Sequence, residues 1–140
     1  GGYLNLLKYQ IEELYLKNVT IYEPTKDLYD FYALSDIFVC ASFEESFPRV
    51  ILEAMAFKLK IVSTDVFGIP EIIQDGYEAY MVKPGNPKAL ASAIRKCLEE
   101  PELSSRIATN GYGKVCRKFN NQNLLKQHLL LAKQVVLSKD

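Results

Sequence analysis

The chain has 140 residues, 49% hydrophobic and 24% charged, a length and balance typical of one globular domain with its own core. Lys and Arg together number 17, as do Asp and Glu, so the basic excess of a general nucleic-acid binder is absent. No apolar run approaches the ~20 residues of a membrane-spanning helix. The three cysteines lack metal-type spacing, which indicates reduced thiols in a cytoplasmic protein.

The chain alternates segments of helical periodicity with short apolar runs typical of strands. We expect a helix over 4–16, a strand over 19–22, a short helix over 27–34, a strand over 36–41, a helix over 48–57, a strand over 60–64, a short helix over 70–74 and a strand over 79–82. Asn86 caps the next helix, and Pro87 suits its first position. Helices over 102–119 and 122–137 follow.

Strands that alternate with helices predict an α/β domain with a mainly parallel sheet. The continuous apolar run over 36–41 is typical of a strand buried on both faces. No linker divides the chain, so we expect a single domain over 1–140. In such sheets ligands bind beyond the carboxyl ends of the strands, which directs attention to the loops after 36–41, 60–64 and 79–82.

The first of these loops leads into a helix at Pro48, the expected first helical position. The next backbone N–H groups, of Arg49 and Val50, would be unpaired. The start of a helix also carries about half a positive charge, so this position would form an anion site that suits a diphosphate. Glu53, in the second helical turn, can accept two hydrogen bonds from a vicinal diol such as a ribose. Glu45 lies in the loop, on the other side of the anion site. A nucleotide sugar requires this layout of an anion site between two carboxylates. Two Glu residues eight positions apart also occur by chance, however. In that case Pro48 only starts a helix and Glu53 is an ordinary solvated carboxylate.

A longer ordered set of motifs is far more specific than this pair. It comprises Ala33-Leu-Ser-Asp36-Ile-Phe-Val, Ser42, Glu45-x-Phe47, Glu53-Ala-Met-Ala56, Ser63-Thr-Asp65, Gly68-Ile-Pro-Glu71-Ile-Ile, Asp75-Gly76 and Val82-x-Pro84-Gly85-Asn86. In this order and spacing, most clearly over 19–119, the chain resembles the C-terminal, nucleotide-sugar-binding domain of the group 1 (family 4) retaining glycosyltransferases of GT-B architecture. The resemblance implies a Rossmann-like parallel sheet flanked by helices.

The resemblance also implies roles for the matching residues. Glu53 would hold the ribose hydroxyls and Glu45 would contact the transferred hexose as the catalytic residue. The other donor-binding positions would be Ser46, Phe47, Pro48, Arg49 and Val50, largely through the backbone. No metal cofactor would be required, because the helix dipole and basic groups neutralise the leaving diphosphate. Ser46 and Pro48 depart from the family's usual glycines, and Phe67 replaces another common glycine, which would narrow the pocket.

Two parts of the family pattern have no match in this chain. The family's C-terminal domain opens with two further strands and a Gly-Arg…Lys motif that binds the diphosphate, and a separate N-terminal domain contacts the acceptor. We therefore expect a truncated domain, inactive alone, with apolar edges on the strands over 19–22 and 36–41. These two strands should pair directly with each other or form an intermolecular contact, such as an edge-strand-mediated dimer.

The intact protein is thus expected to transfer a hexose from a nucleoside-diphosphate sugar to an acceptor hydroxyl with retention of configuration. The rivals are a GT-B nucleotide-sugar epimerase and a non-catalytic nucleotide-sugar-binding module. We expect a cytoplasmic protein without a transmembrane segment; the apolar stretch over 124–137 leaves peripheral attachment at the inner membrane surface open. The base, the sugar and the acceptor stay open, since base contacts in this family are largely backbone, near the turn after 19–22.

Overall fold

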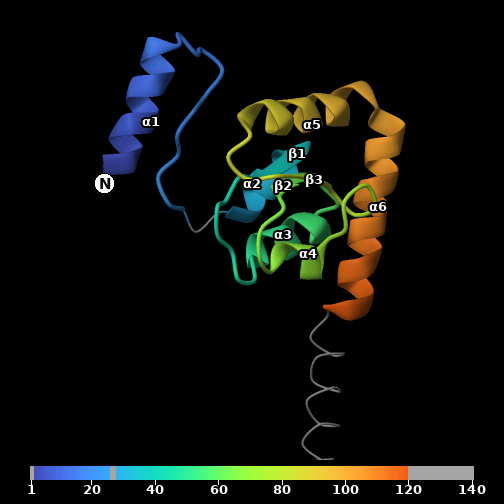
Figure 1. Ribbon diagram of the computed structural model, residues 1–140. Coiled ribbons are helices and arrows are strands. Elements are labelled where there is room, and N and C mark those ends of the chain that lie inside the picture. The colour runs from blue at the N-terminus through green and yellow to red at the C-terminus, as the bar shows by residue number, and fades with distance from the viewer. Residues whose placement is uncertain (1, 26–27, 120–140) are drawn as a thin grey trace, which may run out of the picture.

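A computed structural model describes residues 2–25 and 28–119, in which three parallel strands form one sheet (Figure 1). The strands are β1 (Ile37–Cys40), β2 (Lys60–Thr64) and β3 (Tyr80–Val82), and they lie in the order β1-β2-β3. Val62 of β2 pairs with Val39 on one side and with Tyr80 on the other. The prediction of an α/β domain with a parallel sheet is confirmed.

Helices precede, connect and follow these strands. They are α1 (Gly2–Glu13), α2 (Leu28–Leu34), α3 (Arg49–Ala56), α4 (Ile69–Ile72), α5 (Pro87–Glu99) and α6 (Pro101–Lys118). The predicted Asn86 cap is confirmed, since its side chain accepts a hydrogen bond of 3.0 Å from the Ala89 N–H. Pro48 was expected inside α3 but is its N-cap residue, with an extended backbone. The helix predicted over 122–137 lies outside the described residues.

Alternation along β2 divides the core between the two faces of the sheet. Ile61 belongs to a buried cluster that includes Ile51 of α3 and Ile69 of α4. Val62, the next residue, belongs to a second cluster with Cys97 of α5 and residues of α6. Figure 1 accordingly shows α3 and α4 on one side of the sheet, α5 on the other, and α6 along the side. None of the helices in the part of the chain that the structure describes is long and apolar enough to cross a membrane.

The strand predicted over 19–22 does not form. These residues have no regular secondary structure, and among the described residues β1 pairs only with β2. Direct pairing between 19–22 and 36–41 is therefore a wrong prediction. The reason is that β propensity marks a segment that fits a sheet, but a strand needs a partner for its N–H and C=O groups. A groove separates the two segments, with Tyr22 and Val39 among the residues that line it.

The edge of β1 thus carries apolar side chains that no described strand covers, and Val39 is 39% exposed. The remaining prediction, an intermolecular contact at this edge, is tested with the isolated chain. We expect the isolated chain to self-associate. The variant Val39→Lys, which places a charge on this edge, should shift the chain toward the monomer. Light scattering after size-exclusion chromatography measures the mass. Leu98→Lys, an exposed control on α5, should leave the mass unchanged; a monomeric wild-type chain would contradict the prediction.

Candidate functional site

Hydroxyl groups fix the loop that follows β1. The buried Thr64, at the end of β2, donates from Oγ1 to the Ser42 carbonyl at 2.6 Å. The Ser42 hydroxyl in turn donates to the Glu45 carboxylate, with 3.0 Å between Oγ and Oε1. The end of the neighbouring strand therefore sets where Glu45 lies, and Ser42 orients its half-buried side chain.

The backbone of Gly68 closes on the same loop from the other side. Its N–H donates to the Glu45 carbonyl at 3.0 Å. A Cβ atom at Gly68 would lie 1.7 Å from the Ser46 carbonyl oxygen, a distance that no side chain can accommodate. Phe67, the residue before it, has a positive φ of 39°, so the chain turns sharply into this contact. Only glycine allows the two loops to approach this closely.

The loop enters α3 through the buried Pro48, and no side chain caps the start of this helix. The first N–H groups of a helix have no partner within it, and the helix dipole makes this end positive. Arg49, the first helical residue, is exposed, and Val50 is half-buried. The start of α3 therefore offers backbone donors to an anion beside the Glu45 loop.

Glu53 accepts a hydrogen bond from a tyrosine on α2. The Tyr32 hydroxyl lies 3.1 Å from Glu53 Oε2 and 3.4 Å from the Val50 carbonyl oxygen. Tyr32 is buried, and burial, followed by the hydrogen bond to Glu53 and the negative charge of that residue, raises the pKa of Tyr32 to about 12. The hydroxyl therefore stays protonated at neutral pH and serves as a donor to the carboxylate.

A groove of about 740 Å³ lies at this edge of the sheet. One wall contains Ser42, Glu45 and Val50, and the segment 22–25 contributes to its lining as well. Tyr32 also lines the groove and connects it to Glu53. The volume lies within the range of small-molecule sites, ~300–1,000 Å³. Among the described residues that line the groove, none is a lysine or an arginine.

The structure brings only part of the predicted site to this groove. Glu45 and Val50 line it, and Glu53 lies one hydrogen bond behind Tyr32. The remaining predicted residues, Ser46, Phe47, Pro48 and Arg49, are not among its lining residues. The Ser46 carbonyl covers Gly68, while the Phe47 ring is 48% exposed with its centroid 6.3 Å from that of Phe119.

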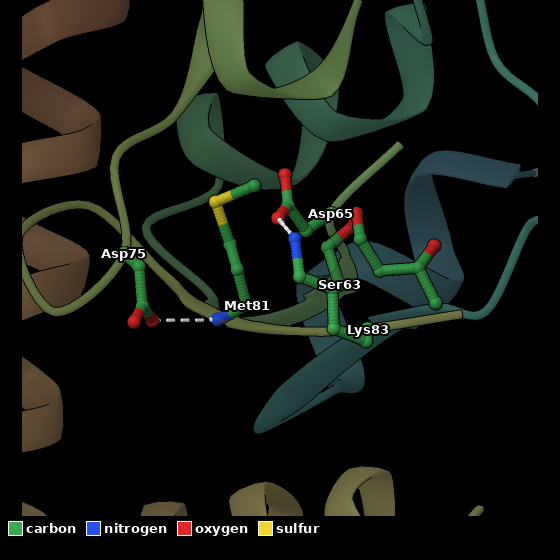
Figure 2. Close-up of polar contacts among 6 residues, drawn as sticks. Ser63, Asp65, Asp75, Met81 and Lys83 are labelled. Atoms are coloured by element: carbon green, nitrogen blue, oxygen red, sulfur yellow. Dashed lines mark hydrogen bonds and ion pairs between the residues drawn. The ribbon is translucent and has the colours of Figure 1, made fainter. Parts of the chain in front are cut away.

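An ion pair joins the loops after β2 and β3 (Figure 2), and neither of its residues lines the groove. Lys83 forms an ion pair with Asp65, so its charge is matched by a carboxylate. Asp75 accepts a hydrogen bond of 2.8 Å from the Met81 N–H. Over residues 2–25 and 28–119, no three His, Cys, Asp or Glu side chains cluster closely enough to hold a metal ion.

Sequence reasoning missed the residues that position the two carboxylates. From the sequence, Thr64 was predicted only as the last residue of a strand, and Tyr32 only as part of the short helix over 27–34. Ser42 and Gly68 belonged to the ordered motifs, but no role was predicted for them. The contacts of Thr64, Tyr32 and Gly68 join segments far apart in the chain, so spacing alone gives no signal for them. The bond from Ser42 to Glu45 spans only three residues, so it is the one contact that a local pattern could have indicated.

Comparisons of the sequence and of the structure with known proteins indicate the same family. The family model described as Glycosyl transferases group 1 matches residues 1–114. The capsular polysaccharide biosynthesis glycosyltransferase CapM of Staphylococcus aureus is 30% identical over 105 residues. That match covers 75% of this chain and 28% of CapM, so the chain spans between a quarter and a third of the length of this curated relative.

Two solved structures are similar to this chain over most of its length. The crystal structure of Anabaena Alr3699/HepE in complex with UDP-glucose superposes with a TM-score of 0.85 at 27% identity, over 94% of this chain and 37% of that one. The C-terminal domain of the glycosyl transferase group 1 family protein LpcC from Francisella tularensis gives a TM-score of 0.75 at 28% identity. That match covers 86% of this chain and 64% of the LpcC chain.

The tight contact at Gly68 predicts opposite effects of the same substitution at two glycines. Gly68→Ala should lower the free energy of unfolding by roughly 1–3 kcal/mol, because its methyl group displaces the Ser46 carbonyl. Gly111→Ala is the matched control. Gly111 lies inside α6, and a Cβ there would meet the Glu78 carbonyl oxygen and Met55 Cγ at 3.5 Å, an ordinary contact, so alanine should stabilise by about 0.5–1 kcal/mol. Urea unfolding measures both, and equal effects would contradict the role of the contact.

Proposed function

Because the chain belongs to the group 1 glycosyltransferase family, we propose that it is the donor-binding part of an enzyme. This enzyme transfers a hexose from a nucleoside-diphosphate sugar to an acceptor hydroxyl with retention of configuration. The observation that supports the proposal best is the groove beyond the end of β1, where Glu45 lines the wall and Tyr32 connects to Glu53. HepE was crystallised with UDP-glucose, which makes uridine nucleotides the first probes to use.

In this proposal the nucleoside lies toward the segment 22–25 and α3. Glu53 accepts hydrogen bonds from the ribose diol, for which a carboxylate with two oxygens is well suited. The segment 22–25 lines the same groove, and the base lies beside it in this proposal. This placement agrees with the expectation that base contacts lie near the turn after 19–22.

The diphosphate lies at the start of α3 in this proposal. The backbone N–H groups around Pro48, Arg49 and Val50 face developing negative charge, and the helix dipole adds to their effect. Ser46 and Phe47 contribute through the backbone on the sugar side. None of the described groove-lining residues is a lysine or an arginine. The Gly-Arg…Lys motif that binds the diphosphate in the family has no match in this chain, so we propose that the neutralising cations come from polypeptide outside it. That polypeptide would also bind the acceptor, so the isolated chain should be inactive.

The proposed reaction breaks one bond and forms one at the anomeric carbon of the hexose. The bond from this carbon to the diphosphate oxygen breaks, and the nucleoside diphosphate leaves with the bonding electrons. The acceptor oxygen bonds to the same carbon, and its proton passes to the leaving diphosphate. Glu45, held by Ser42, contacts the hexose and favours the geometry of this transfer. No metal ion is part of the proposal.

The ribose role predicts a specific loss on mutation. Glu53→Ala in the full-length protein should weaken UDP binding about 10- to 100-fold, because hydrogen bonds to a charged acceptor are lost. Isothermal titration calorimetry measures the affinity. Glu99→Ala, which removes an exposed carboxylate from α5 on the other face of the sheet, serves as the control. Wild-type affinity in Glu53→Ala would remove Glu53 from this role.

The hexose role predicts a different pattern for the loop carboxylate. Glu45→Ala should lower the rate of UDP release from UDP-glucose by roughly 100-fold, with UDP affinity within about 3-fold of wild type. Water serves as the acceptor in this assay, so the natural acceptor is not needed. Glu44→Ala, an exposed neighbour, is the control. A loss of UDP affinity with normal turnover would reverse the assignment of the two carboxylates.

A further inference from the structure

We infer that Tyr32 is a positioning residue that holds the Glu53 carboxylate in the orientation that distinguishes a ribose from a deoxyribose. This inference rests on the proposed function, since it adds a specificity device to the same site. It starts from the direct contact between the Tyr32 hydroxyl and Glu53 Oε2, at 3.1 Å. The two residues lie 21 positions apart on different helices, so the contact is tertiary.

The tyrosine ring is held on several sides. Tyr32 is 4% exposed, and its ring centroid lies 5.5 Å from that of Phe57 and 5.8 Å from that of Phe38. The Val50 carbonyl oxygen, at 3.4 Å from the hydroxyl, lies on the same helix as Glu53. Because packing fixes the ring, the hydroxyl is a stationary donor, and Glu53 must adapt to it.

The chemistry of the carboxylate explains what this donor can achieve. A carboxylate accepts about four hydrogen bonds through its two oxygens, so one bond from Tyr32 to Oε2 leaves Oε1 and a further lone pair for a diol. A free glutamate side chain would lose rotamer freedom when the diol binds, whereas a held one has already lost it. The high pKa of Tyr32 keeps the hydroxyl protonated, so it donates to Glu53 and does not repel it.

An ordinary structural explanation exists, namely that a buried hydroxyl needs an acceptor. The two explanations differ in what the ligand experiences. If Tyr32 only satisfies its own hydroxyl, its loss affects all ligands equally, through stability. If it orients Glu53, its loss weakens ligands that carry the whole diol more than ligands that lack the 2′-hydroxyl.

The test compares UDP with 2′-deoxy-UDP in the full-length protein, using calorimetry on wild type, Tyr32→Phe and Tyr29→Phe. Tyr29 is the matched control, because it lies on the same helix, is 58% exposed and loses the same hydroxyl. Tyr32→Phe should weaken UDP binding about 3- to 10-fold and change 2′-deoxy-UDP binding by less than about 2-fold, as expected for one lost hydrogen bond. Tyr29→Phe should change neither affinity.

The outcomes separate this inference from the proposed function. Equal weakening of both nucleotides in Tyr32→Phe, or no weakening of either, would overturn the positioning role while Glu53→Ala still reports on the ribose site. A wild-type protein that binds UDP but does not discriminate against 2′-deoxy-UDP would also overturn it. Failure of wild type to bind UDP at all would overturn the uridine-nucleotide donor and this inference together. The positioning role is supported if Tyr32→Phe loses the preference for UDP over 2′-deoxy-UDP and Tyr29→Phe keeps it.

Discussion

The backbone contact between Gly68 and the Ser46 carbonyl brings together two loops that come from neighbouring strands. The loop after β1 contains Glu45, and the loop after β2 leads into α4. Their contact is possible only because Gly68 has no side chain. Once the loops meet, the Gly68 N–H fixes the Glu45 backbone and Thr64 fixes the Ser42 backbone. The position of the acidic loop is therefore a property of the sheet end and not of the loop sequence alone.

Both carboxylates of the candidate site follow the same design. Each accepts a bond from one hydroxyl group, Ser42 for Glu45 and Tyr32 for Glu53. Each also keeps acceptor capacity for a ligand, because one hydroxyl occupies only a fraction of a carboxylate. Held side chains lose less entropy when a ligand binds, and this is the general benefit of a preorganised site. The carboxylates that line the groove, Glu23 and Glu45, make it acidic, and its described lining supplies no compensating cation.

The sequence predicted the elements well where their signals are local. The helix start at Asn86 and the strand over 60–64 depend on neighbouring residues, and both formed as expected. The strand over 19–22 failed because pairing depends on a partner that propensity does not reveal. The site was predicted as a list of motif positions, and only part of that list lines the groove. Tyr32 was missed because its contact with Glu53 spans two helices, and no periodicity encodes such a contact.

The order of the strands has a consequence for how the chain folds. Since β1, β2 and β3 are neighbours in both sequence and space, each new strand pairs with the one made just before it. Each pairing then closes a loop of only one βα unit, which keeps the loop-closure entropy low for a parallel sheet. During synthesis it would grow in one direction, by addition of successive βα units beyond β1. Among the described strands, β1, which lines the groove, is then made before β2 and β3 complete the core behind it.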